Sequence, residues 1–376
     1  MKLLCFLADL QGGGAERTMI NLCTGFQDLG LSPTLSVVNA DGRAREWIDP
    51  RIDFRPLNAG RVRYALPGLR RLLVQMKPDL LFSTKLDANI ISAAATYSLG
   101  EQAPRLVVRE TNSHIARGDI GTLRSKAIGL AYRSSDRVVA LSEGIRTELV
   151  DLYKLAPSQV VTIHNPVAIP NLVVAAQRAA NEPSPVGRNH RLVVAVGRLT
   201  RQKGFDILLH AFAHTSLANT ILAILGEGEE RQELQALTAT LGLENRVILP
   251  GFVSNPGKWL AHADLFVLSS RWEGFGHVIV EAMAAGVPVV AFDCPHGPRD
   301  IIENNVTGVL VPTNDEVELG LRIAQVLSNS AMGAQLSAAA RKKLHRFSLT
   351  EISKTYVQLF REIVYQDAAI GRVENC

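Results

Sequence analysis

A short apolar strand that runs into a polar glycine turn and then into an apolar helix is the feature that most constrains this sequence. The strand is predicted at residues 264–268 and the helix at residues 278–285, with Glu273, Gly274 and Gly276 in the turn. This order is typical of sheets covered by helices. The first N–H groups of such a helix have no partner within it, and with the helix dipole they favour an anion such as phosphate. The stretch therefore predicts an α/β fold with an anion site where the strand ends.

Two carboxylates belong to this stretch. Glu281 lies about one turn into the helix, which carries no other charge, and Glu273 precedes the turn. A carboxylate that is removed from water needs hydrogen-bond donors, and the hydroxyl groups of a ligand would serve. The alternative is that Glu273 is an ordinary loop acid and Glu281 a buried acid with partners in the protein, because motif matches are only hypotheses.

Length and composition indicate two globular domains. The chain has 376 residues, 47% of them hydrophobic and 20% charged, which suits two packed cores and argues against disorder. No apolar stretch reaches the roughly 18 residues that a membrane-spanning helix needs. The apolar run at the start is cut off by Asp9, so we expect a first buried strand and no secretory signal. The four cysteines lie far apart without metal-ligand spacing, which favours a reducing, cytoplasmic setting.

Strands and helices alternate through the first half of the chain, which predicts a parallel, doubly wound sheet. Three glycines, Gly12, Gly13 and Gly14, follow the first strand and would let the backbone approach a ligand closely. Their spacing is neither a dinucleotide fingerprint nor a P-loop. Predicted strands cover residues 2–8, 34–38, 79–83, 106–108, 137–140 and 160–163.

A basic segment at residues 61–77 alternates arginines with leucines. It is consistent with an amphipathic helix that lies on a membrane, although such a segment is more often a covering helix whose polar side faces water. The net charge of the chain is +4, and the excess lies in the amino-terminal half. That half could contact an anionic membrane surface or a phosphate-bearing acceptor, or the excess could simply be solvated.

The second half repeats the strand and helix alternation after a loosely organised segment at residues 168–190, which is rich in proline and is interpreted as a linker. We therefore expect domains at residues 1–168 and 185–349. Arg198 and Lys203 follow the first strand of the second domain, in a loop with a glycine on either side. Arginine offers a rigid fork to phosphate oxygens and lysine a point charge, although a solvated loop is the alternative. Predicted strands cover residues 191–196, 220–225, 246–249, 264–268, 287–291 and 306–311.

The motif Ser-Arg-Trp-Glu-Gly-Phe-Gly…Glu-Ala-Met-Ala-Ala-Gly-Val-Pro-Val-Val, in which seven residues separate Glu273 from Glu281, resembles the Glu-x7-Glu signature of retaining glycosyltransferases of family four. The resemblance covers nearly the whole chain, most specifically residues 191–312. It implies the GT-B fold, in which two Rossmann-like doubly wound parallel-sheet domains face a cleft. It also implies that a final helix, at about residues 350–376, packs back on the first domain.

The resemblance implies a role for each motif residue. Arg198 and Lys203 would clamp the donor diphosphate, Glu281 would hold the ribose hydroxyls, and Glu273 would act at the transferred sugar. His114, in the loop after the strand at 106–108, would lie near the leaving carbon, although the sequence around it departs from the usual His-Asp form. The remaining donor contacts would come from the glycine loop, the turn after the strand at 246–249 and the start of the helix: Gly13, Gly14, Phe252, Val253, Phe275, Gly276, His277 and Val278.

The resemblance also implies the chemistry. We expect retention of configuration with no protein base, because the leaving phosphate takes the acceptor proton. We expect no metal and no cofactor, because cations and N–H groups stabilise the leaving diphosphate and the sequence has no Asp-x-Asp pair.

The run from Asp293 to Ile302 is similar to that of enzymes that use UDP-hexoses or UDP-N-acetylhexosamines in bacterial cell-surface glycan assembly. A UDP-sugar donor, a lipid-linked or polysaccharide acceptor and a cytoplasmic location follow as expectations, with contact to the inner membrane left open and no nucleic-acid partner.

Three alternatives stay open beside a UDP-sugar transferase. A GDP-sugar transferase would belong to the same class of enzyme but use a different donor. A GT-B isomerase, such as a UDP-N-acetylglucosamine 2-epimerase, would need no acceptor. A sugar-nucleotide-binding protein without activity would bind the donor and release nothing, although the presence of both glutamates argues against it. A nicotinamide oxidoreductase is disfavoured, because neither half carries the dinucleotide fingerprint.

Overall fold

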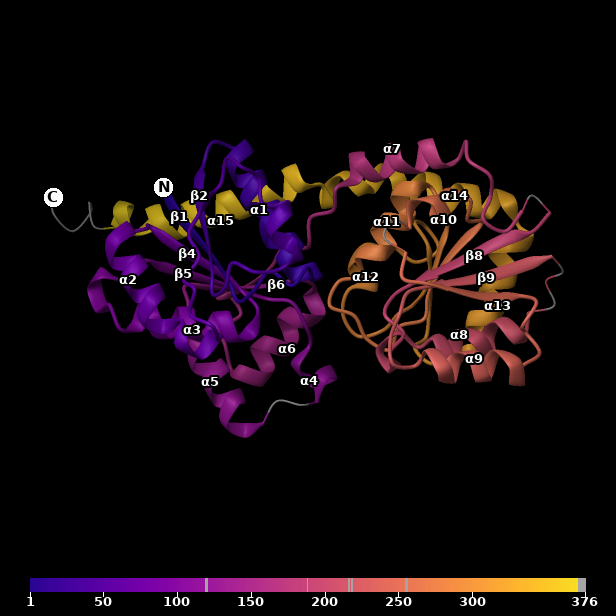
Figure 1. Cartoon of the computed structure of the whole chain (residues 1–376), viewed down its shortest axis with the longest axis horizontal. Helices are drawn as coiled ribbons and strands as arrows, with labels where there is room; N and C mark the ends of the chain where they lie inside the picture. The colour runs from indigo at the N-terminus through magenta and orange to yellow at the C-terminus, as the bar shows by residue number, and fades with distance from the viewer. Residues whose placement is uncertain (119–120, 188, 216, 218, 254–255, 371–376) are drawn as a thin grey trace. The chain divides into compact units, whose positions relative to one another are not determined.

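The computed structural model describes residues 1–118, 121–187, 189–215, 217, 219–253 and 256–370. The chain forms two compact units, each built on one parallel sheet (Figure 1). The first unit consists of Met1–Pro166 together with Leu349–Cys376, and the second consists of Val167–Ser348. Both are α/β units of the Rossmann type, as the alternation of strands and helices predicts.

The first sheet has seven strands in the order β3-β2-β1-β4-β5-β6-β7, all parallel. The chain order reverses between β1 and β4, which makes the carboxyl ends of these two strands the switch point where open α/β sheets bind ligands. The strands are β1 (Lys2–Leu7), β2 (Ser32–Val37), β3 (Asp53–Phe54), β4 (Leu80–Thr84), β5 (Arg105–Glu110), β6 (Arg137–Ala140) and β7 (Val160–Thr162).

Helices cover both faces of this sheet (Figure 1). On one face α15 packs against α1, and the core between them and the sheet includes edge-on aromatic pairs such as Phe26 and Phe360, whose ring centroids lie 5.5 Å apart. The long final helix is thus part of the first unit. The helices are α1 (Gly14–Asp28) and α15 (Leu349–Ile370) on this face, and α2 (Leu66–Met76), α3 (Leu86–Tyr97), α4 (His114–Arg117), α5 (Thr122–Arg133) and α6 (Glu143–Tyr153) on the other.

The second sheet has six parallel strands in the order β10-β9-β8-β11-β12-β13. Here the order reverses between β8 and β11, so the second switch point lies at the carboxyl ends of these strands. The strands are β8 (Arg191–Val196), β9 (Thr220–Leu225), β10 (Val247–Gly251), β11 (Leu265–Leu268), β12 (Val289–Phe292) and β13 (Val309–Val311).

Two layers of helices enclose the second sheet (Figure 1). One layer contains α8 (Phe205–Ala213), α9 (Arg231–Thr240) and α13 (Glu316–Ser328). The other contains α7 (Ile169–Ala179), α10 (Gly257–Ala261), α11 (His277–Ala285), α12 (Pro298–Ile301) and α14 (Ser330–Lys343).

The linker predicted at residues 168–190 is wrong in its first half, because residues 169–179 form α7 and belong to the second unit. Proline fits the first turn of a helix, where its missing N–H would have no partner anyway. The buried side chains Ala176 and Ala179 lie on this helix, which packs against α10 and α11. The second unit therefore begins at Val167, not near residue 185.

The basic segment predicted as one helix at 61–77 divides into a short 3-10 turn at Val62–Tyr64 and α2. Its leucines Leu69, Leu72 and Leu73 are buried, and α2 packs against α3. The apolar side of α2 is therefore occupied by the protein, which contradicts a helix that inserts its leucines into a membrane. Among the described residues no helix is both long and apolar enough to cross a membrane.

Candidate active site

The loop after β8 places Lys203 across the switch point of the second sheet. A Cβ on Gly197 would stand 3.1 Å from three carbons of the Lys203 side chain, so the lysine stem lies directly over this glycine. Gly204 has φ +61°, and a Cβ there would stand 2.2 Å from the carbonyl oxygen of Ser269. Gly204 is therefore required for the loop to fold against β11, and at position 197 a larger residue would push the lysine stem aside.

Lys203 and Glu273 form an ion pair at the switch point of the second sheet. The Lys203 ammonium donates to Glu273 Oε1 at 2.5 Å, and the Ser270 hydroxyl donates to the same oxygen at 2.7 Å. Glu273 is 7% exposed, and its own N–H donates to the carbonyl oxygen of Pro295 at 3.2 Å. Both side-chain bonds use Oε1, which leaves Oε2 of Glu273 for a ligand. Two residues 70 positions apart in the sequence thus form one partly buried ion pair.

The glycine turn leads into α11. Gly276 is the residue before the helix and has φ +95°. Only glycine adopts this backbone conformation readily. Phe275 is buried, and its ring packs edge-on against His277 with the centroids 5.4 Å apart. Val278 and Glu281 on the helix are half-buried, so Glu281 is less enclosed than the sequence suggests.

Arg198 is exposed, and its guanidinium makes no hydrogen bond or ion pair to another described residue. It follows β8 in the same loop as Lys203. Phe252 is 77% exposed and Val253 is half-buried, both directly after β10. The predicted donor residues of the second unit therefore all follow the carboxyl ends of β8, β10 and β11 or lie on α11.

Further bonds hold this arrangement in place. The Gln202 side chain donates to the carbonyl oxygen of Trp272 at 2.9 Å, and the N–H of Arg271 donates to the carbonyl oxygen of Gln202 at 2.8 Å. The Arg271 guanidinium binds Asp206 with both of its terminal nitrogens, at 2.9 and 2.6 Å. Burial raises the pKa of Asp206, but the hydrogen bond and charge of Arg271 outweigh it, so the pKa is lowered overall. The loops after β8 and β11 are thus tied together.

Cys294 lies beside this site but is poorly suited to nucleophilic chemistry. It is buried, and burial raises the pKa of its thiol well above the usual value, with a smaller contribution from the Glu273 carboxylate. A thiol attacks as the thiolate, so a raised pKa keeps it inert.

In the first unit, Gly13 and Gly14 lie at the start of α1, after β1, and both are exposed. Glu16, in the first turn of α1, is buried and forms an ion pair with Lys85, which follows β4. The predicted glycine loop therefore lies at the switch point of the first sheet, next to charged groups that the sequence did not single out.

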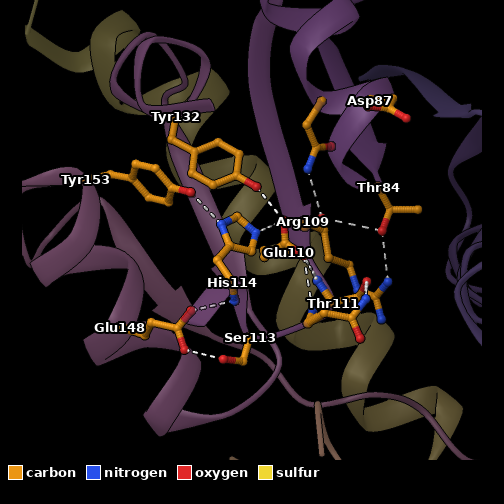
Figure 2. A network of polar contacts seen from close by, with 12 residues as sticks. Thr84, Asp87, Arg109, Glu110, Thr111, Ser113, His114, Tyr132, Glu148 and Tyr153 are labelled. Carbon is orange, nitrogen blue, oxygen red and sulfur yellow. Dashed lines mark hydrogen bonds and ion pairs between the residues drawn. The ribbon is translucent and has the colours of Figure 1, made fainter. Parts of the chain in front are cut away.

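His114 lies in a buried network at the carboxyl end of β5 (Figure 2). Its Nδ1 lies 2.6 Å from the Tyr153 hydroxyl and its Nε2 lies 3.0 Å from Glu110 Oε2. Glu110 also accepts from the Tyr132 hydroxyl. The imidazole is 4% exposed with a partner at each nitrogen, so the ring supports the loop after β5 in this structure.

Two carboxylates anchor that loop. Glu148 accepts hydrogen bonds from the Ser113 hydroxyl at 2.6 Å and from the N–H of His114 at 2.6 Å (Figure 2). Burial raises the pKa of Glu110, but bonds from His114 and Tyr132 outweigh this effect, so its pKa is lowered overall. Burial also raises the pKa of Tyr153 to about 12, which keeps its hydroxyl protonated.

Comparisons with known proteins agree with this fold. A protein-family model described as "Glycosyltransferase Family 4" matches residues 12–169, and one described as "Glycosyl transferases group 1" matches residues 177–343. Together the two models span most of the chain, so the chain belongs to the glycosyltransferases. It is an enzyme of the transferase class with the GT-B fold.

Two relatives of this glycosyltransferase are named for steps of glycan assembly. It is 26% identical over 358 residues to the lipopolysaccharide core biosynthesis glycosyltransferase LpsE of Rhizobium meliloti, covering 92% of this chain and 95% of LpsE. It is 27% identical over 254 residues, 66% of this chain and 68% of the relative, to the N-acetylgalactosamine-N,N'-diacetylbacillosaminyl-diphospho-undecaprenol 4-alpha-N-acetylgalactosaminyltransferase of Campylobacter jejuni. The crystal structure of Anabaena Alr3699/HepE in complex with UDP superposes with a TM-score of 0.84 at 23% identity, covering 96% of this chain and all of that one.

The sequence of this glycosyltransferase did not indicate the residues that hold the predicted site residues in place. Ser270 and Gln202 are neutral loop residues, and only the folded loop shows that they bind Glu273 and Trp272. Asp9 and Lys85 follow two different strands, and the strand order brings them together. Within the described ranges no three His, Cys, Asp or Glu side chains form a group that could hold a metal ion. The expectation of a metal-independent reaction stays a prediction.

Proposed function

We propose that this glycosyltransferase transfers a hexose or N-acetylhexosamine from a UDP-sugar, with retention of configuration, to a lipid-linked or polysaccharide acceptor during assembly of a bacterial cell-surface glycan. The observation that carries the proposal is the Lys203–Glu273 pair at the switch point of the second sheet, with exposed Arg198 in the same loop as Lys203. A sugar nucleotide needs cations for its diphosphate and carboxylates for its hydroxyls, and the site has both.

In this proposal Arg198 and Lys203 hold the diphosphate, together with the N–H groups at the start of α11. Glu273 keeps Lys203 in place through Oε1 and accepts a hydroxyl of the transferred sugar through Oε2. Glu281, half-buried on α11, accepts the ribose hydroxyls. Exposed Phe252 and the backbone of Val253 lie against the nucleotide base.

The reaction we propose breaks the bond between the anomeric carbon and the diphosphate oxygen, and the electron pair leaves with UDP. The acceptor hydroxyl oxygen bonds to the anomeric carbon on the same face, and its proton passes to the leaving phosphate. Positive groups fixed at the leaving diphosphate stabilise the charge that develops there. No protein base is needed, and His114, whose ring nitrogens both have partners, positions the loop after β5.

The names of the relatives support the acceptor part of this proposal. One acts on a diphospho-undecaprenol-linked saccharide and another in lipopolysaccharide core biosynthesis. A related structure, the lipopolysaccharide outer core galactosyltransferase WaaB, shares the fold with a TM-score of 0.75 at 21% identity. The neighbour solved with UDP makes UDP the first nucleotide to test.

The test is an assay of UDP release from UDP-glucose, UDP-galactose and their N-acetylhexosamine counterparts, with undecaprenyl-diphosphate saccharides as acceptors. Acceptor-dependent release together with a glycosylated product of unchanged anomeric configuration would support the proposal. Conversion of a donor alone into its epimer would move the chain to the isomerases. Nucleotide release from GDP-sugars alone would keep the protein among the glycosyltransferases and refute the UDP-sugar donor.

Peripheral membrane contact belongs to the same proposal, through the exposed basic side of α2. Arg70, Arg71 and Lys77 are exposed and have no acidic partner among the described residues. Each basic residue near an anionic membrane contributes about 1 kcal/mol, so Arg70→Gln with Arg71→Gln should weaken binding to phosphatidylglycerol vesicles roughly 30-fold. Equal sedimentation of the double variant and the wild type would contradict this contact.

A further inference from the structure

A buried arginine stands near the carboxyl end of β5, on the face of the first sheet that α15 covers. Arg109 is 1% exposed. Side chains alternate between the two faces of a strand, so Arg109 shares its face with Val107. Val107 belongs to the apolar core that also contains Tyr356 and Phe360 of α15. An apolar side chain would therefore be expected at position 109.

The hydrogen-bond partners of this guanidinium are neutral. Its Nη1 donates to the Thr84 hydroxyl at 3.0 Å (Figure 2), and its Nη2 donates to the side-chain oxygen of Asn165. Glu110 acts on the guanidinium through its charge, but its oxygens accept hydrogen bonds from Tyr132 and from two backbone N–H groups instead. Arg109 is thus a buried cation held by an alcohol and an amide.

One nitrogen of Arg109 has no partner at all. Neither its Nε nor the hydroxyl of Tyr356, which lies beside the guanidinium, has a hydrogen-bond partner among the described residues. Burial lowers the pKa of Arg109, and this effect outweighs the opposing influence of Tyr356 and Glu110. A buried charge without a bonded counter-charge costs free energy, and apolar residues in its place are often neutral or stabilising. Stability alone therefore does not account for an arginine here.

The guanidinium connects the segment that leaves the first unit with the helix that returns to it. Asn165 is buried and stands one residue before Pro166, where the first stretch of this unit ends. Tyr356 lies on α15, which begins where the chain returns to the unit at Leu349. Arg109 is therefore placed to fix the exit segment against the returning helix, within the first unit.

Arg109 also holds the end of β4. Thr84 is the last residue of that strand, fully buried, and β4 ends at the switch point of the first sheet. The Arg109 carbonyl oxygen accepts from the Asn89 side chain at 3.0 Å, and Asn89 accepts from the Ser83 hydroxyl at 2.8 Å. Arg109 thus belongs to a polar network that joins β4, β5 and α3. Buried networks of this kind rigidify a structure and specify one arrangement.

We propose that Arg109 is a positioning residue of the transfer reaction, which sets the places of the exit segment at Asn165 and of the end of β4 without touching a substrate. The inference rests on the proposed transferase function and deepens it. The planar fork of an arginine offers donors in fixed directions, so one side chain holds both partners at once. A misplacement of about 1 Å can cost about 100-fold in rate, so a shift of these segments lowers turnover.

The test uses Arg109→Met and the double variant Arg109→Met with Asn165→Leu. The matched control is Arg105→Met, the same change at the other end of β5, where the side chain is 42% exposed and pairs with Asp136. Four quantities are measured on the full chain: the melting temperature, UDP affinity by calorimetry, turnover of UDP-glucose and UDP-N-acetylglucosamine with undecaprenyl-diphosphate saccharides, and amide hydrogen exchange over residues 160–167 by mass spectrometry.

Arg109→Met removes the donor to Asn165, so it should melt below the double variant, in which neither a buried charge nor an unpaired amide remains. The double variant should melt at or above the wild type. Its exchange over residues 160–167 should be about tenfold faster or more, and its turnover at saturating substrate about tenfold slower or more. UDP affinity should not change, because Arg198 and Lys203 lie in the second unit. The control should match the wild type in all four quantities.

Wild-type turnover in a folded double variant overturns the proposal, because Arg109 would then be structural only. If neither variant folds, Arg109→Lys makes the test, since it keeps a charge but has no fork to hold two partners. Wild-type turnover in that variant overturns the proposal in the same way. A wild type that turns over no donor refutes the proposed function instead, and exchange at the wild-type rate in the variant then shows by itself that Arg109 does not fix the exit segment.

Discussion

Replacing Lys203 by methionine should separate the structural role of the Lys203–Glu273 pair from its role at the donor phosphates. The side chains of Lys203 and Glu273 are 17% and 8% exposed, so the variant leaves a nearly buried carboxylate with only the Ser270 hydroxyl as donor. Removing one partner of a buried ion pair typically costs about 3–5 kcal/mol. We take about 3 kcal/mol, because part of the pair reaches solvent.

The assay is thermal unfolding, followed by UDP-sugar turnover on the same samples. For a unit of this size, a cost of about 3 kcal/mol lowers the melting temperature by roughly 6–12 °C. The double variant Lys203→Met with Glu273→Gln carries no unpaired charge and should recover most of that loss. Turnover should stay at least about 100-fold below the wild type in both, because a cation at the leaving phosphate is missing.

Lys342→Met is the matched control, since Lys342 is exposed on α14 in the same unit. Surface substitutions of this kind usually change the free energy of unfolding by less than about 0.5 kcal/mol. The reasoning is refuted if Lys203→Met melts with the wild type, or if the double variant is as unstable as the single one. Full turnover in either variant would remove Lys203 from the site.

Three more predictions concern single residues. Glu281→Ala should weaken UDP binding about 10- to 100-fold in calorimetry, because an ionised acceptor of the ribose hydroxyls is lost. The melting temperature should stay close to that of the wild type. Unchanged UDP affinity would exclude Glu281 from the site. The lowered pKa of Glu110 means that its ionised form stabilises the fold above about pH 4.3, and that this contribution is lost as the pH falls through the folded pKa. The difference in free energy of unfolding between wild type and Glu110→Gln, from urea titrations, should therefore shrink from pH 5 to pH 3, and a constant difference would contradict the hydrogen-bonding pattern. Cys294, whose buried thiol has a raised pKa, should escape iodoacetamide at pH 8 until the enzyme is unfolded, and rapid labelling in the native enzyme would show that it is accessible.

The fold was largely predictable because its strands are short apolar runs bounded by glycine turns. Gly204 and Gly276 have positive φ and are needed for the backbone geometry of their loops, so the local pattern indicated these loops of the second unit. The helix α7 was not found, because Pro170 and the prolines at 183 and 185 made the whole segment resemble a linker. Its stability comes from packing against α10 and α11, which local sequence does not show.

Only those parts of the site that lie within one sequence motif could be predicted. The pairing of Lys203 with Glu273 depends on the order of β8 and β11 in the sheet, so the sequence suggested both residues but not their contact. The expected position of His114 near the reacting carbon stays a prediction, and the structure adds two buried neighbours of its ring, Tyr153 and Glu110. Tyr153 lies 39 positions away in the sequence, and no local pattern connects the two.

The most direct test of the donor site is a thermal-shift measurement with UDP, GDP, ADP and UDP-sugars, with and without EDTA. A ligand that binds only the folded state raises the melting temperature by mass action. We expect a rise with UDP and UDP-sugars that EDTA does not change and that Lys203→Met abolishes. No rise with any nucleotide, or an equal rise in the variant, would contradict a nucleotide-sugar site at Lys203 and Glu273.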